Sequence, residues 1–292
     1  MPVLGIISMG KCGGYLSNFT KNINQLFGTF FIIFVMLIIG PLFAIPRTAA
    51  TTYEIAIRPN FGISSVLSSF IFFAITLFFV LTPNNVIDRV GKFLTPALIA
   101  VLGLLVIKGF ITPIGRPSDP SVDKIFLRGF KEGYQTMDAL AAIVFSTVIL
   151  NAIRGKTELT SKQEFSYLLK VGLIAAAGLA IVYAGLTYIG ASFGGMELVA
   201  GAEKTDLLVK ISINLLGKIG YLILAICVAG ACLTTSIGLI VTVAEYFSSL
   251  IKISYEKLVV ITTIIGFVFA MFGVNKIVII SVPVLVFLYP IS

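Results

Sequence analysis

Long apolar runs, separated by short polar stretches, make up most of the chain. An α-helix needs about 20 residues to cross the ~30 Å hydrocarbon layer of a bilayer, and most of the runs are close to that length. The pattern predicts an all-α integral membrane protein, a single bundle over residues 1–292 with no soluble domain. We expect about eight spans, at residues 27–55, 64–82, 93–113, 133–153, 170–193, 219–248, 257–274 and 277–290.

The first apolar run is interrupted by a polar stretch that extends from Gly40 to Glu54. Pro41 and Pro46 each remove a backbone donor, and a carbonyl freed in lipid is costly unless protein or water satisfies it. Arg47 is costlier still, because charged residues at membrane depth usually face a cavity or a partner. The stretch therefore predicts a broken helix that builds a polar site inside the membrane. Glu54, near the end of the run, is expected at the membrane interface.

A second polar entry into a span is the segment from Gly133 to Asp138. An unwound helix start here would present backbone amides and the positive end of the helix dipole to an anionic group. Asp138 has two interpretations that the sequence leaves open. Its carboxylate either lines a transport path or caps its own helix.

Three hydroxyl residues, Thr234, Thr235 and Ser236, follow one another in the middle of the sixth span. In membrane helices such hydroxyls often bond to their own backbone carbonyls, which is the structural interpretation. The functional alternative is a cation site, because hard cations take oxygen ligands. Consecutive helical positions point about 100° apart, so at most two of the three can face one ion.

Composition narrows the class of protein. The chain is 58% hydrophobic and 12% charged, whereas soluble domains are about 25% charged. The net charge of +8 comes from basic residues in short loops, as expected beside anionic lipid headgroups, so we expect the lipid bilayer and not nucleic acid as a partner. Histidine is absent, and no phosphate-binding loop or pair of catalytic acids is visible. We therefore expect a non-enzyme with no cofactor, and no metal beyond a possible sodium ion.

Several motifs resemble those of one family, the bacterial branched-chain amino acid:cation symporters. The resemblance covers essentially the whole chain, and the motifs agree in order and spacing. They are Gly40–Ala49, Gly129–Phe130 with Gly133–Leu140, Cys232–Leu239 with Ala244–Phe247, and Ile280–Leu285.

The resemblance implies an importer of leucine, isoleucine and valine in the bacterial inner (cytoplasmic) membrane, driven by sodium or protons. It also implies a LeuT-like architecture of five-plus-five inverted repeats, with these spans as the third to tenth core helices. The expected substrate-binding residues are Gly133, Tyr134, Thr136, Asp138, Pro46, Arg47 and Thr48, and the expected cation-binding residues are Thr234, Thr235 and Ser236. Sodium is favoured because hydroxyls dominate the cation group, while Asp138 keeps proton coupling open.

In the resembling family, a first helix and most of a second would precede Met1, and further helices would follow Ile291, so we expect truncation at both ends. We therefore expect a partial chain that lacks part of the binding site. The alternative function is an inactive membrane fragment that associates with other chains and transports nothing by itself.

Overall fold

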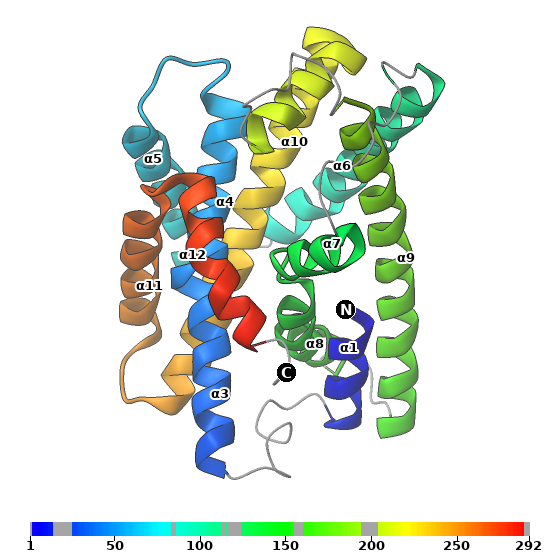
Figure 1. The fold of residues 1–292 in the computed structure, drawn as a ribbon. Coiled ribbons are helices and arrows are strands. Elements are labelled where there is room, and N and C mark those ends of the chain that lie inside the picture. The colour runs from blue at the N-terminus through cyan, green and yellow to red at the C-terminus, as the bar shows by residue number, and fades with distance from the viewer. Residues whose placement is uncertain are drawn as a thin grey trace. The chain divides into compact units, whose positions relative to one another are not determined.

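The computed structural model describes residues 2–13, 25–82, 86–112, 115, 124–154, 160–193 and 204–288. Every regular element in these ranges is a helix, and no strand occurs among them (Figure 1). The chain divides into two compact units. The first unit comprises Met1–Ile39, Phe126–Ile181 and Val282–Ser292, and the second comprises Gly40–Ile125 and Val182–Ser281.

The helices begin and end as follows. They are α1 (Pro2–Lys11), α3 (Gln25–Leu37), η1 (Ile38–Leu42), α4 (Ala44–Thr52), η2 (Tyr53–Ile57), α5 (Ser65–Leu81), α6 (Val86–Ile111), α7 (Ile125–Tyr134), α8 (Asp138–Arg154), α9 (Ser161–Phe193), α10 (Lys204–Leu250), α11 (Tyr255–Ala270) and α12 (Gly273–Leu288).

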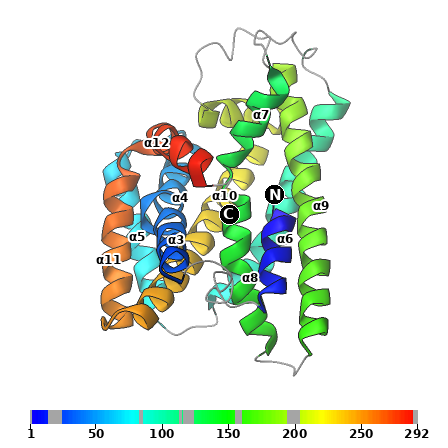
Figure 2. The same ribbon diagram turned by 60° about the horizontal axis from the view of Figure 1, so that its bottom comes forward.

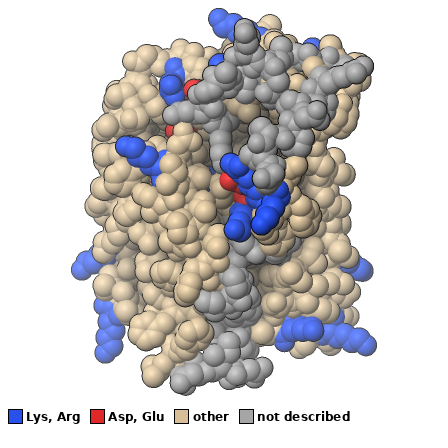
Figure 3. All heavy atoms as spheres, in the orientation of Figure 1, with Lys and Arg blue, Asp and Glu red and all other residues tan. Residues whose placement is uncertain are grey.

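Several of these helices are long and apolar enough to cross a membrane, which confirms the prediction of an all-α membrane protein. On the face seen in Figure 3, most of the described surface is uncharged. Four candidates are Leu26–Ile57, Lys92–Ile111, Ser161–Phe193 and Thr205–Leu250. A fifth is the pair α11 and α12, which is bent by 106° at the intervening turn.

Two helices extend beyond the spans expected from the sequence. Helix α9 begins at Ser161, so part of the charged stretch before residue 170 is helical. Helix α10 begins at Lys204 and bends at Gly217, where φ is +71°. Glycine reaches this left-handed conformation without the strain that a Cβ would add. The last residues of the expected spans 93–113 and 277–290 lie outside the described ranges.

In the second unit, α4 lies among α5, α10 and α11 (Figure 1). Small residues permit this close packing, as is common between membrane helices. A Cβ on Gly266 of α11 would lie 3.0 Å from Cγ2 of Ile45 on α4. A Cβ on Gly40 would lie 2.8 Å from Cγ2 of Val243 on α10. A side chain at either glycine would therefore require the facing side chain, Ile45 or Val243, to shift.

In the first unit, α1 lies along α8 (Figure 2), again through glycine. A Cβ on Gly5 would lie 2.7 Å from the carbonyl oxygen of Ala139. At the other end of α8, Arg154 donates two hydrogen bonds to Glu164 of α9, at 2.6 and 2.7 Å, and a third to the Gly13 carbonyl at 2.9 Å. Bidentate pairs of this kind are among the stronger ionic contacts in proteins. The pair therefore fixes the ends of three helices of this unit.

Candidate functional site

The backbone leaves the helical conformation at Gly40, inside the first apolar run. Its φ of −84° and ψ of −121° are not those of a helix, and Pro41 follows it. A proline disfavours the helical conformation of the residue before it, and its ring clashes with the preceding turn. The Gly-Pro pair therefore accounts for a break at this position, and α4 begins afresh at Ala44.

Helix α4 carries the three substrate candidates of this segment. Pro46 is buried, and Arg47 and Thr48 are half-buried. The hydroxyl of Thr48 donates to the carbonyl of Ile45 at 2.6 Å, and that of Thr52 donates to the carbonyl of Thr48 at 2.9 Å. These two hydroxyls thus satisfy their own helix, which is a structural role.

The second unit brings α4 against the part of α10 that carries the three consecutive hydroxyls. Just before them, the thiol of Cys232 interacts with the hydroxyl of Thr52 and with the charge of Arg47. Two segments nearly 200 residues apart in the sequence are therefore neighbours within one unit. The predicted cation residues and the predicted residues of α4 lie on helices that pack together.

The three hydroxyls of α10 have different surroundings. Thr234 donates to the Ala231 carbonyl at 3.0 Å, the structural role that the sequence had left open. Thr235 is exposed. Ser236 is fully buried, and among the described residues its hydroxyl has no hydrogen-bond partner. Since a buried polar group is costly without a partner, Ser236 is the hydroxyl of the three that most needs a ligand.

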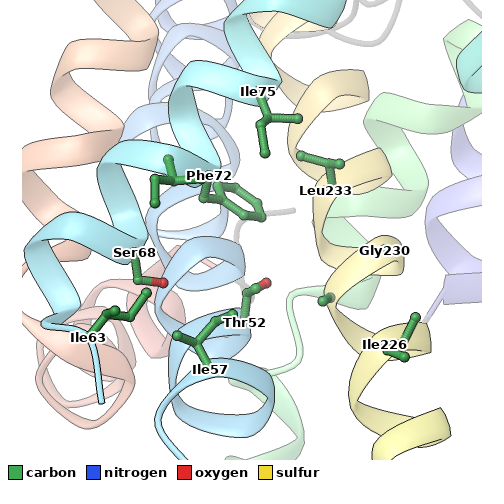
Figure 4. A pocket seen from close by; sticks show the side chains of 11 residues that line it. Thr52, Ile57, Ile63, Ser68, Phe72, Ile75, Ile226, Gly230 and Leu233 are labelled. Carbon is green, nitrogen blue, oxygen red and sulfur yellow. The ribbon is translucent and has the colours of Figure 1, made fainter. Parts of the chain in front are cut away.

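An apolar cavity of about 370 Å³ lies between α4, α5 and α10 (Figure 4). Figure 4 shows the hydroxyl of Ser68 pointing toward Thr52, while Ile75 and Leu233 approach each other from α5 and α10. The other lining side chains are almost all aliphatic or aromatic. The full lining is Thr52, Ile57, Ile63, Ser68, Ile71, Phe72, Ile75, Ile226, Ala229, Gly230 and Leu233.

The other predicted break, in the first unit, lies between the end of α7 at Tyr134 and the start of α8 at Asp138. Met137 takes a φ of +59°, which is unusual for a residue with a side chain. The amide of Thr136 donates to the carbonyl of Gly133 at 3.3 Å, and its hydroxyl donates to the same oxygen at 2.8 Å. The side chain of Tyr134 lies outside what the structure describes.

At this break, the amide and hydroxyl of Thr136 therefore donate to a carbonyl of the same segment. The start of a helix has amides without an acceptor within that helix, and α8 begins with Asp138, while the amide of Ala141 donates to the Met137 carbonyl at 2.9 Å. The Asp138 carboxylate already places a negative charge at the positive end of this helix dipole, which stabilises it there. A second carboxylate bound at the same place would experience repulsion from Asp138.

The burial of Glu54 within the protein was not expected from the sequence. Its side chain is 7% exposed, and its carboxylate accepts two hydrogen bonds. The hydroxyl of Thr205 donates to Oε2 at 2.6 Å, and the amide of Val274 donates to Oε1 at 3.0 Å. These donors lie at the beginnings of α10 and α12. An acid beside an apolar run was the one available signal of its burial.

Comparison with known proteins agrees with the motifs. A family model described as branched-chain amino acid transport protein matches residues 1–292. The branched-chain amino acid permease BraB of Bacillus subtilis is 38% identical over all of this chain and 67% of its own length. The branched-chain amino acid transport system 2 carrier protein of Pseudomonas aeruginosa is 36% identical over all of this chain and 68% of its own length.

Proposed function

Because this chain belongs to the branched-chain amino acid transport protein family, we propose that it carries leucine, isoleucine and valine across the bacterial inner membrane. The observation that carries the proposal is the match of the family over every residue from 1 to 292. The names of the relatives, a permease and a carrier, support transport and not catalysis.

The apolar cavity of the second unit supports a branched aliphatic substrate. Ligand pockets are about 300–1,000 Å³ and mostly apolar, and this one, at about 370 Å³, fits a small ligand. Burial of an aliphatic group contributes about 0.8 kcal/mol for each CH₂. We infer that the cavity receives the aliphatic side chain of the substrate, and that Pro46, Arg47 and Thr48 border the substrate's path along α4.

The roles of the first-unit break are proposed from the resemblance. Gly133, Tyr134 and Thr136 would belong to the segment that holds the substrate carboxylate, and Asp138 would line the path. The charge of Asp138 at the start of α8 sets a condition on this proposal. Because like charges repel, a cation beside Asp138 would favour binding of the substrate carboxylate there, and this would link substrate binding to the coupling ion.

The coupling cation is proposed to bind at the hydroxyl group of α10. Ser236 is the principal candidate, since its buried hydroxyl has no partner in the described part of the chain. Thr235 and Thr234 remain candidates as neighbours. Sodium is favoured because hydroxyl oxygens dominate this group, and proton coupling through Asp138 is the alternative. For the architecture, we propose the five-plus-five inverted repeat that the family resemblance implies, on the basis of the order of the motifs.

Uptake of labelled leucine tests this function. Cells deficient in their own branched-chain amino acid uptake would express the complete reading frame that contains this sequence. We expect uptake above an empty-vector control, competition by isoleucine and valine but not by lysine, and a dependence on external sodium or on pH. If the protein is found in the membrane and leucine uptake equals that of the vector control, the proposal is wrong. Uptake that ignores both sodium and pH would contradict ion coupling alone.

A further inference from the structure

The second unit contains another cavity, of about 210 Å³, whose lining differs in kind from the one in Figure 4. Its lining residues place it where α4 continues into η2, next to the turn between α11 and α12. The lining residues are Ala50, Tyr53, Glu54, Arg58, Ser65, Ser69, Ala270, Met271, Phe272 and Gly273. An acid, a base and three hydroxyl side chains, those of Tyr53, Ser65 and Ser69, are therefore gathered around this space.

Glu54 gives this cavity its charge. Its two carboxylate oxygens accept from Thr205 and Val274, but a carboxylate offers about four acceptor positions. Neither donor carries a formal charge, so these bonds do not neutralise the buried carboxylate. A buried charge normally requires a counter-charge, because its loss of hydration is costly.

The base that lines the cavity, Arg58, also lies near a second acid. Nη1 of Arg58 lies 3.7 Å from Oδ1 of Asp206, the residue that follows Thr205. Taken together, Glu54, Arg58 and Asp206 carry one negative charge in excess. This local excess favours a cation of single charge.

Ser69 supplies an independent sign of a ligand. The residue is 1% exposed and lines the cavity, and its Oγ has no hydrogen-bond partner among the residues that the structure describes. Serine hydroxyls in membrane helices usually bond to their own backbone, as that of Ser281 does to Val278. The Ser69 hydroxyl is therefore a buried oxygen that is free to take a ligand.

The end of α11 adds further oxygen donors. The last carbonyls of a helix have no partner within it and carry the negative end of its dipole. Helix α11 ends at Ala270, and both Ala270 and Met271 line the cavity before the chain bends by 106° into α12. Carboxylate, hydroxyl and carbonyl oxygens are the ligands that hard cations prefer.

We propose that this cavity binds a sodium ion through the carboxylate of Glu54 and the hydroxyl of Ser69, with carbonyl oxygens at the end of α11. The described residues contain no cluster of three or more acids or cysteines, as a multivalent metal would favour. The formal charges of Glu54, Arg58 and Asp206 sum to −1, which one monovalent cation would balance. The site is separate from Thr234, Thr235 and Ser236, and its lining residues come from α4, η2, α5, α11 and the start of α12.

The test measures the thermal stability of the purified complete protein in detergent, without any amino acid substrate, in sodium chloride or in potassium chloride at equal concentration. We expect sodium to raise the melting temperature above its value in potassium. Ser69→Ala is expected to raise the sodium concentration needed for half of this effect by at least about tenfold, as loss of a metal-site residue commonly does. Glu54→Gln is expected to have the same effect.

The matched control is Ser68→Ala, because Ser68 is the next residue of α5, is also buried, and lines the apolar cavity. Ser68→Ala should keep the sodium effect of the wild type. The proposal is overturned if sodium has no effect on the wild type, or if Ser69→Ala responds to sodium as the wild type does. Since Ser69→Ala removes one oxygen atom, its folding can be verified in potassium chloride. The test measures thermal stability without substrate, so its outcome does not depend on whether the protein transports leucine.

Discussion

Two cavities border the same segment, Thr52–Glu54, and the neighbouring residues Ser68 and Ser69, yet they differ in how their polar groups are satisfied. Beside the apolar cavity, Thr52 bonds to its own helix. In the polar cavity, Glu54 bonds to two distant helices and Ser69 has no partner among the described residues. Polar groups that satisfy their own helix can border an apolar space without binding anything. Those that cannot are the ones that require tertiary partners or ligands.

The largest effect should come from Glu54→Ala. The change leaves the hydroxyl of Thr205 and the amide of Val274 without their acceptor, and we expect it to lower the free energy of unfolding by about 3 kcal/mol. Denaturant titration of the protein in detergent measures this quantity. The control is Glu245→Ala, at an exposed acid of α10, which should change stability by less than about 0.5 kcal/mol. Equal losses of unfolding free energy in the two variants would show that the hydrogen bonds of Glu54 to α10 and α12 do not stabilise the fold.

Next in size is a substitution that fills the apolar cavity. Ala229 lines it, and Ala229→Phe should reduce leucine uptake about tenfold or more, because the ring occupies the space proposed for the substrate's side chain. The control is Ile223→Phe, at an exposed position of α10 outside the cavity lining. The sodium-dependent rise in melting temperature should survive Ala229→Phe. Normal leucine uptake by Ala229→Phe would show that the substrate does not bind in this cavity.

The smallest effect separates two neighbouring hydroxyls. Ser236→Ala should raise the sodium concentration for half-maximal leucine uptake by about threefold to tenfold, because it removes a buried oxygen without a partner in the described structure. Thr234→Ala should change it little, since the Thr234 hydroxyl bonds to Ala231. Uptake measured over a range of sodium concentrations distinguishes the two. An equal change in both variants would mean that the ion binds elsewhere, or that the three consecutive hydroxyl residues have only a structural role.

Much of the fold could be predicted from the sequence because membrane helices have a strong local signal. The break at Gly40 follows from the Gly-Pro pair, and the helical class follows from the lengths of the apolar runs. The surroundings of Glu54 could not be predicted, because its partners lie 151 and 220 positions away along the chain. The sequence also could not distinguish Thr234 from Ser236, because both are hydroxyls in one helix and differ only in which neighbours they face.

The central claim is that this chain is part of an ion-coupled carrier of branched-chain amino acids. The most direct test reconstitutes the complete protein in liposomes and measures accumulation of labelled leucine when an inward sodium gradient, an inward proton gradient or neither is imposed. The account predicts that leucine accumulates against its own gradient under one of the two ion gradients and only equilibrates without them. Equal leucine contents in all three conditions, at a level no higher than in protein-free liposomes, would contradict it.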